Sequence, residues 1–323
     1  MFRMAREAPH DALRVATRLS IGFALDLVKL GGFGRDVIDG LLLAAISQAN
    51  VAQITRDPEL QRLYARLDQP PPDELRRPVS INAVANSLRI PFETARRRVA
   101  ALIEIGAVQS VPRGVIIPTA PLTSPAYKAV AEAYYQLVRN LYVRLRGIGL
   151  LDELPKPRVG GFDPANPPVR LVLRLSSNYI LRLAEPISLH IGDLVSGLIL
   201  LEMFQANTEH LPDTEGGRAD GDWSPDSFVD DAHRRPVRAA ALSERLGIPP
   251  ETTRRRLARL LKDGRCERIE DGYVVTSRVL AKELLVKFVL DNQSQLYRLY
   301  AALADLGVVA EWEHEIQSLQ GAA

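Results

Sequence analysis

The chain has 323 residues, of which 46% are hydrophobic and 25% charged, the balance of an ordinary globular protein with room for two domains. Its longest apolar run, Val37 to Ile46, is interrupted by Asp39 and Gly40, falls far short of the roughly 20 residues that cross a bilayer, and follows no signal peptide. The only cysteine is Cys266, which excludes an internal disulfide framework and predicts a reducing, cytoplasmic environment.

The net charge of +2 conceals two basic blocks. Residues 76–114 contain seven Arg and two Glu, and residues 234–272 contain eleven Arg or Lys and six Asp or Glu, so that each block carries +5. The rest of the chain therefore carries −8. Two compact basic blocks in an otherwise acidic chain predict two surfaces for a polyanion.

The two blocks are copies of one sequence. Aligned at an offset of 158, the 39 positions from Arg76 to Gly114 share 17 identities with the second block. Upstream, the Gln-Ala-Asn sequence of residues 48–50 recurs at residues 205–207. So long a unit, present only twice, predicts duplicated domains and excludes a solenoid.

The duplication predicts a domain plan for the whole chain. The expected parts are an N-terminal helical segment 1–35, a first domain 36–150, a Pro/Gly-rich linker 151–170, a second domain 171–310 and a tail 311–323. Within the second domain, residues 209–233 contain eight carboxylates and little apolar surface, which predicts a mobile surface loop.

Each copy is expected to fold, in chain order, as helix, short strand, helix, turn, helix, hairpin and long helix. Apolar spacing places the first helix around residues 37–46 in one copy and from residue 194 in the other, and prolines at 91 and 249 restart the third helix. Inward faces are expected at Ala95, Val99 and Leu102, and at Thr253, Leu257 and Leu260. The hairpin strands are expected at 108–111 with 115–117, joined through Arg113-Gly114, and at 266–269 with 273–275, joined through Asp271-Gly272.

Residues 248–275, IPPETTRRRLARLLKDGRCERIEDGYVV, resemble the recognition helix and wing of bacterial winged helix-turn-helix regulators of the GntR, MarR and IclR kind. The resemblance covers about 80 residues of each half. It implies a mostly α fold with small β-wings, two winged-helix domains in tandem, and double-stranded DNA as the partner. The chain departs from those families in carrying two modules and no identifiable effector domain, so no small-molecule effector is assigned.

On the third helix, Arg97 falls opposite the inward face, with Arg96 and Arg98 on its flanks. An outermost arginine of this kind is expected to bind guanine in the major groove, and the flanking arginines are expected to bind phosphates. The second wing ends in an acidic tip, Glu270-Asp271, so the copies need not bind equally well. The predicted DNA-binding residues are Glu93, Thr94, Arg96, Arg97, Arg98 and Arg113, and Glu251, Thr252, Arg254, Arg255, Arg256, Arg259 and Arg268.

The alternative for the arginine triplets is a solvated helix face, with Glu93–Arg97 and Glu251–Arg255 as ion pairs at i,i+4 spacing. Basic residues at a wing tip also serve solubility. The five histidines show no metal-ligand spacing, and Cys266 is expected to pack. No catalytic constellation is present, so no enzyme activity, cofactor or metal site is predicted.

Two long helices, 126–146 and 280–306, carry apolar stripes, which predict either a homodimer or the packing of the two halves as a pseudo-dimer. The function predicted from these features is a sequence-specific, double-stranded DNA-binding transcription regulator in the cytoplasm, associated with the nucleoid and not with a membrane. The alternatives are a plasmid- or phage-type replication initiator, and a non-enzymatic winged-helix scaffold that binds protein partners.

Overall fold

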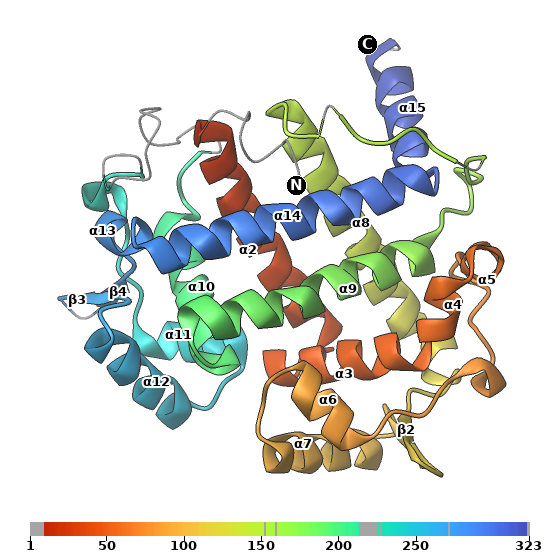
Figure 1. The fold of residues 1–323 in the computed structure, drawn as a ribbon, viewed down its shortest axis with the longest axis horizontal. Coiled ribbons are helices and arrows are strands. Elements are labelled where there is room, and N and C mark those ends of the chain that lie inside the picture. The colour runs from red at the N-terminus through yellow and green to blue at the C-terminus, as the bar shows by residue number, and fades with distance from the viewer. Residues whose placement is uncertain are drawn as a thin grey trace. The chain divides into compact units, whose positions relative to one another are not determined.

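The structure, a computed structural model, describes residues 10–151, 153–158, 160–212, 225, 228–270 and 272–321. Most of these residues are helical, and the strands among them form two separate antiparallel hairpins (Figure 1). The prediction of a mostly α chain with small β elements is therefore confirmed.

The chain forms two compact units, and each unit is assembled from two stretches of sequence. Unit 1 comprises Met1–Gly40 and Arg182–Ser294, and unit 2 comprises Leu41–Leu181 and Gln295–Ala323. The boundaries of the compact units therefore differ from those of the duplicated sequences. The helix that precedes the first copy belongs to unit 1 with most of the second copy, and most of the helix that opens the second copy belongs to unit 2 with the first.

Unit 2 contains most of the first copy. Its elements are α3 (Val37–Asn50, from Leu41 onward), α4 (Ala52–Arg56), α5 (Pro58–Leu63), η1 (Asp73–Leu75), α6 (Ile81–Ser87), α7 (Phe92–Glu104), β1 (Gln109–Val111), β2 (Gly114–Ile116), η2 (Pro121–Thr123), α8 (Pro125–Gly147), α9 (Val169–Pro186, up to Leu181), the end of α14 and α15 (Val308–Gly321).

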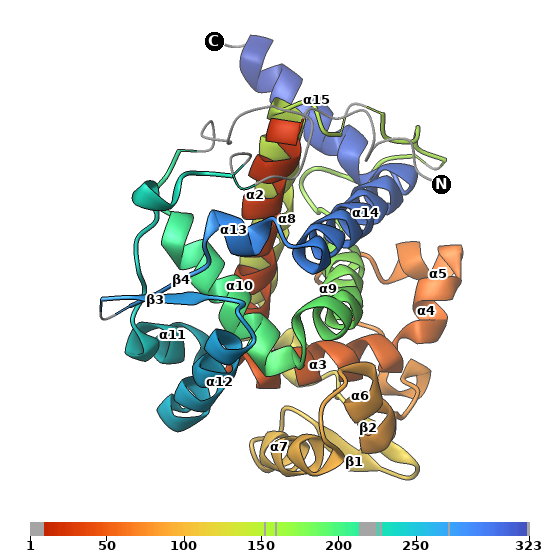
Figure 2. The same ribbon diagram turned by 60° about the vertical axis from the view of Figure 1, so that its left-hand side comes forward.

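Unit 1 contains most of the second copy. Its elements are α2 (His10–Gly31), the π turn η3 (Ile187–Ile191), α10 (Leu194–Thr208), η5 (Asp231–His233), α11 (Ala239–Leu246), α12 (Pro250–Lys262), β3 (Glu267–Ile269), β4 (Gly272–Val274), α13 (Ser277–Leu280) and α14 (Glu283–Asp305, up to Ser294). Helix α10 packs against α2, α11 and α12 (Figure 2).

Local sequence signals explain where these elements begin and end. Ser80 caps α6 by accepting a hydrogen bond from the backbone N–H of Ala83 at 3.1 Å. Gly247 ends α11 in the left-handed conformation, with φ of 65°. The hairpin strands lie within one residue of their predicted positions in both copies.

The core of unit 2 is aromatic and includes α15. Trp312 is fully buried, donates its indole N–H to the hydroxyl of Tyr135 at 2.7 Å, and packs against the ring of Tyr142 at a centroid distance of 5.5 Å. Residues 311–321, expected only as a tail, thus continue a helix that contributes to the core. The apolar stripe of α8 is covered within the same unit, because Tyr134, Val138, Leu141 and Leu145 are all buried.

Two sequence predictions fall largely on residues outside the described set. The acidic loop predicted at 209–233 includes residues 213–224, 226 and 227, and the second hairpin tip includes Asp271, all of which lie outside it. None of the described helices is long and apolar enough to cross a membrane alone, although residues 169–191 and 194–208 meet that criterion together.

Candidate nucleic-acid interface

Each copy builds its hairpin against a short edge strand in the same way. Val79 bridges to Val115 on β2 with two backbone hydrogen bonds, and Val237 bridges to Tyr273 on β4 with two more. A Cβ on Gly114, whose φ is +152°, would collide with the carbonyl oxygen of Val79. The glycine is therefore required for the edge strand to approach this closely.

A buried asparagine holds each edge strand in place. Asn50, at the end of α3, donates to the carbonyl oxygens of Arg77 and Val115 and accepts from the backbone N–H of Ile117. The donor–acceptor distances are 2.8, 3.2 and 2.9 Å. The asparagine is fully buried, and its amide makes three hydrogen bonds to backbone groups of the edge strand and the hairpin.

Asn207, at the end of α10, makes the same three bonds in unit 1. It donates to Arg235 at 2.7 Å and to Tyr273 at 3.1 Å, and it accepts from Val275 at 2.9 Å. In the sequence this asparagine stands out only as part of the repeated Gln-Ala-Asn tripeptide. Its identity in both copies was the available signal for a role in positioning the hairpin.

Several arginines of the basic blocks belong to the scaffold and not to the surface. Arg76 and Arg234 are 5% and 6% exposed, and each donates to an aspartate three residues earlier, Asp73 or Asp231. Arg245 donates to Glu202, which is fully buried. The charge that each block presents to solvent is therefore smaller than its sequence count of +5.

The buried faces of α7 and α12 agree with the sequence prediction. Ala95, Val99 and Leu102 are fully buried on α7, and Thr253, Leu257 and Leu260 are buried at the equivalent positions of α12. Because successive residues turn by about 100°, Arg97 and Arg255 lie opposite those faces. Both side chains are exposed.

The ion pairs on these helices differ from the expected ones. Glu93 accepts two hydrogen bonds from Arg96, at 2.9 and 2.6 Å, and Glu251 accepts one from Arg254 at 2.5 Å. The predicted i,i+4 pairs Glu93–Arg97 and Glu251–Arg255 are thus replaced by i,i+3 pairs. Both spacings bring side chains together on a helix, and at i,i+3 the guanidinium of Arg96 meets its carboxylate with two N–H groups. Hydrogen bonding by Arg96 lowers the pKa of Glu93.

The third arginine of each triplet turns toward the protein. Arg98 is half-buried, and Arg256 donates to Asp193 at 2.9 Å. Asp193 also caps α10, so Arg256 ties α12 to the start of that helix. Arg259 remains 62% exposed, at 3.7 Å from Asp263.

These contacts leave one exposed arginine in each triplet, Arg97 or Arg255, available to bind a ligand. Within the described part of the chain, neither Arg97 nor Arg255 makes a hydrogen bond or ion pair with another residue. The remaining predicted residues also lie at the surface or near it: Arg113 at the first hairpin tip and Arg268 on β3 are exposed, and Thr94 and Thr252 are half-buried. Arg113 adopts a φ of +75°, which directs the chain through the two-residue turn.

The described residues contain no group of three or more His, Cys, Asp or Glu side chains placed to hold a metal ion. Cys266 is buried between α12 and β3, as expected of a packing residue, and burial raises the pKa of its thiol to about 12.

Cys266 is therefore expected to resist alkylation in the native protein. With a pKa near 12 in place of about 8.5, the thiolate population at pH 8 falls by roughly a thousandfold. Labelling with iodoacetamide, followed by mass spectrometry, checks this. The folded chain should stay unmodified over a period in which the urea-unfolded chain reacts fully, and equal rates would contradict the burial.

The chain matches no protein-family model, and neither a curated protein nor a solved structure is significantly similar to it.

Proposed function

We propose that each copy is a winged helix-turn-helix module and that the chain binds double-stranded DNA as a sequence-specific transcription regulator. In this proposal α7 and α12 are the recognition helices, and the hairpins β1–β2 and β3–β4 are the wings. The order of elements and the matching backbone bonds of Asn50 and Asn207 support two equivalent modules.

The observation that carries the proposal is the repeated exposure of one arginine opposite the buried face of the third helix. Arg97 and Arg255 occupy equivalent positions, and the neighbouring arginines Arg96 and Arg254 are held by Glu93 and Glu251. Arginine presents two parallel N–H groups that fit O6 and N7 of guanine in the major groove. A helix inserted in that groove places its outermost side chain against base edges and its flanks near the phosphates.

In this proposal the flanking residues have different roles. Arg96 and Arg254 reach phosphate only by exchanging or sharing their glutamate partners, which lowers their net contribution to affinity. Arg256 is held by Asp193 and serves chiefly to orient α12. Arg113 and Arg268 extend from the hairpins, where phosphate or the minor groove lies in wing-mediated binding.

Binding to linear duplex DNA is expected to weaken steeply with salt. Each phosphate neutralised contributes a slope of about −0.9 to a plot of log affinity against log salt concentration. If the flanking arginines Arg96 and Arg254 and the hairpin arginines Arg113 and Arg268 each engage a phosphate, the slope should be about −3 or steeper. Fluorescence anisotropy between ~50 and ~200 mM NaCl measures it. Affinity that does not change with salt would contradict a phosphate-led interface.

Arg97→Ala and Arg255→Ala are each expected to reduce discrimination between a duplex selected from a random pool and an unselected one. The loss of a guanine contact corresponds to about 1–3 kcal/mol, or roughly 5- to 150-fold. Arg96→Ala and Arg254→Ala should change affinity for both duplexes alike, and Arg56→Ala, at an exposed site on α4, should change neither. Equal effects of the Arg97 and Arg96 variants on specificity would overturn the assignment.

A further inference from the structure

Each copy of the duplicated sequence is preceded or opened by a long helix, which we call its leading helix. Residues 14–20, RVATRLS, recur as residues 170–176, RLVLRLS, at an offset of 156. The first run lies on α2 and the second on α9, so α2 leads the first copy and α9 leads the second. The duplication therefore supplies two equivalent helices whose packing can be compared.

Each leading helix packs on the other copy. On α9, the backbone N–H of Leu171 donates to the carbonyl of Ala65 at 3.1 Å, and Arg170 donates to the carbonyl of Leu67 at 2.9 Å, both in the first copy. Helix α2 packs against α10 of the second copy, and its Arg18 donates to the carbonyl of Pro212 at 2.5 Å. Within one chain, the two copies have thus exchanged their leading helices.

Equivalent side chains hold the two leading helices. On α2, the hydroxyl of Ser20 accepts a hydrogen bond from the side-chain amide of Asn292 on α14 at 2.7 Å. On α9, the counterpart of Ser20 is Ser176, which hydrogen-bonds with Tyr134 of α8. Tyr134 is the counterpart of Asn292 at an offset of 158. The same pair of positions therefore holds a leading helix in each unit.

A charge pair determines which leading helix the surface of unit 1 accepts. Lys29 of α2 lies 2.7 Å from Glu202 of α10, whose side chain is fully buried. The counterpart of Lys29 on α9 is Glu185, and the counterpart of Glu202 in the first copy is Ala45. If α9 took the place of α2, Glu185 would face a buried carboxylate, and like charges that water does not screen repel strongly. The surface formed by α10 and α14 is thus specific for α2.

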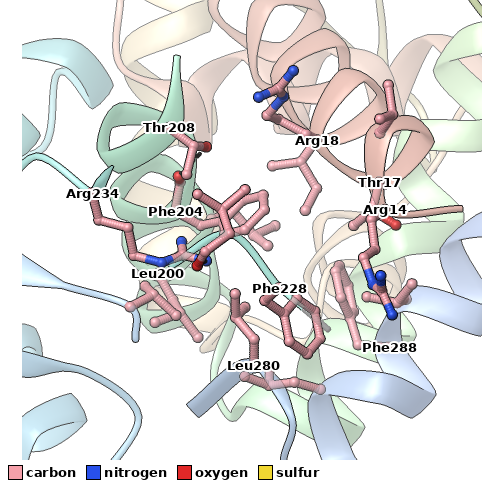
Figure 3. A pocket seen from close by; sticks show the side chains of 17 residues that line it. Arg14, Thr17, Arg18, Leu200, Phe204, Thr208, Phe228, Arg234, Leu280 and Phe288 are labelled. Carbon is pink, nitrogen blue, oxygen red and sulfur yellow. Dashed lines mark hydrogen bonds between the residues drawn. The ribbon is translucent and has the colours of Figure 1, made fainter. Parts of the chain in front are cut away.

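The packing of α2 on this surface is incomplete. A cavity of about 70 Å³ lies between them, and Figure 3 shows Thr17 and Arg18 of α2 lining it together with Phe204 of α10 and Phe288 of α14. Side chains that border a void lack the packing contacts that a filled interface would provide. The void therefore makes α2 easier to release than a fully packed core helix.

The connection after α2 also favours its release. Residues 32–36 join α2 to α3, and within them Phe33 and Gly34 have φ angles of 51° and 80°. A left-handed conformation is costly for a residue with a large side chain, so an opened connection relieves strain at Phe33. Helix α9, by contrast, lies between the two copies and is connected to both. Only α2 can leave its place by opening a single connection to the copies.

We propose that the surface formed by α10 and α14 in unit 1 binds α2 of a second copy of the chain, so that two chains associate by reciprocal exchange of this helix. The contacts of α2 with unit 1, including Lys29–Glu202 and Ser20–Asn292, form again between the chains, and the connection 32–36 alone changes conformation. Exchange of an identical element is a low-cost route to a dimer for this reason. It needs neither α7 nor α12, so its failure leaves the proposed function untouched.

The length of the connection tests the proposal in the full chain. Deleting Phe33 and Gly34 removes both left-handed residues that turn the chain from α2 into α3. In this shortened chain α2 no longer reaches its own unit 1, and the protein should be a dimer at ~10 µM by size-exclusion chromatography with light scattering. The control has two glycines inserted after Gly34, and it should stay monomeric because a longer connection still lets α2 fold back. A shortened chain that is monomeric or unfolded would overturn the proposal.

Charge reversal shows whether α2 makes the dimer contact. In the shortened chain, Lys29→Glu should raise the dissociation constant of the dimer by about tenfold or more, because it sets a carboxylate against buried Glu202. Lys287→Glu, at an exposed position of α14, is the matched control and should leave the constant unchanged. Equal dissociation constants for the two variants would exclude α2 from the interface and contradict the exchange.

The unmodified chain gives a measurement that needs no variant. Its connection holds α2 near its own unit 1 at an effective concentration of about 1 mM, so exchange is expected chiefly in chains that fold together at high concentration. After refolding from urea at ~0.5 mM, the dimer fraction should exceed that after refolding at ~5 µM by about fivefold or more. Dimer fractions that do not depend on the concentration during refolding would also refute the proposal.

Discussion

Replacing Trp312 with alanine is expected to lower the free energy of unfolding by about 3–5 kcal/mol, the range for truncating a large buried aromatic side chain. The indole is fully buried, and its removal leaves a void between the rings of Tyr135 and Tyr142. The variant also leaves the hydroxyl of Tyr135 without its indole donor. The lost ring contacts add to the free-energy cost of losing buried apolar area, because edge-to-face aromatic pairs stabilise a fold by more than their burial alone.

Urea denaturation followed by circular dichroism measures the effect. Trp312→Phe retains a ring against Tyr142 but not the N–H, so it should cost clearly less than the alanine variant. Leu284→Ala removes a large apolar side chain that is 44% exposed, and should cost well under 1 kcal/mol. A Trp312→Ala variant as stable as Leu284→Ala would mean that α15 does not belong to the core of unit 2.

Asn50→Ala and Asn207→Ala are each expected to lower the free energy of unfolding by about 2 kcal/mol or more. Asn50→Ala leaves the carbonyl of Arg77 and the N–H of Ile117 without this partner, Asn207→Ala does the same to Arg235 and Val275, and each such group costs about 1–3 kcal/mol. The damage should be local at first, because the lost bonds join the end of one helix to the edge strand and to β2 or β4. Amide hydrogen exchange should therefore quicken at Val79 and Val115 in the first variant, and at Val237 and Tyr273 in the second.

Chemical denaturation and exchange rates give the two readouts. Asn140→Ala, at an exposed position of α8, is the matched control and should stay within about 0.5 kcal/mol of the parent chain. Asn207→Asp keeps an acceptor for Val275 but loses both donors and introduces a charge, so it should be at least as destabilising as the alanine variant. Unchanged exchange at Val237 in Asn207→Ala would show that the asparagine does not hold the strand.

Much of the secondary structure was predictable because its signals are local. Ser80 caps α6, Gly247 ends α11, and two-residue turns set the hairpin registers, each through bonds spanning only a few residues. The inward faces of α7 and α12 followed from periodicity alone, since an apolar side chain every three or four residues has one way to avoid water.

The remaining features depend on tertiary neighbours. The partners of Asn50 lie 27 to 67 residues away, so no short pattern identifies them. Arg96 and Arg97 are both spaced to reach Glu93, and the side-chain geometry determines that Arg96 forms the ion pair. The repeat between residues 14–20, RVATRLS, and residues 170–176, RLVLRLS, is short and lies outside the two 39-residue blocks of the duplication, so it gives only a weak sequence signal.

Because each unit is assembled from two distant stretches of sequence, its core cannot form until the second stretch has been synthesised. Helix α2 leaves the ribosome well before α10, against which it packs, because α10 begins at Leu194, 163 residues after Gly31. At roughly 5–20 residues per second, the apolar face of α2 waits about ten seconds or longer for its partner. Unit 2 waits longer still, because Trp312 lies 177 residues after Tyr135, to which it donates. A nascent chain of this design exposes core surface until the second stretch of each unit has been made, and a stop codon between Leu194 and Leu285 leaves neither unit able to complete its core.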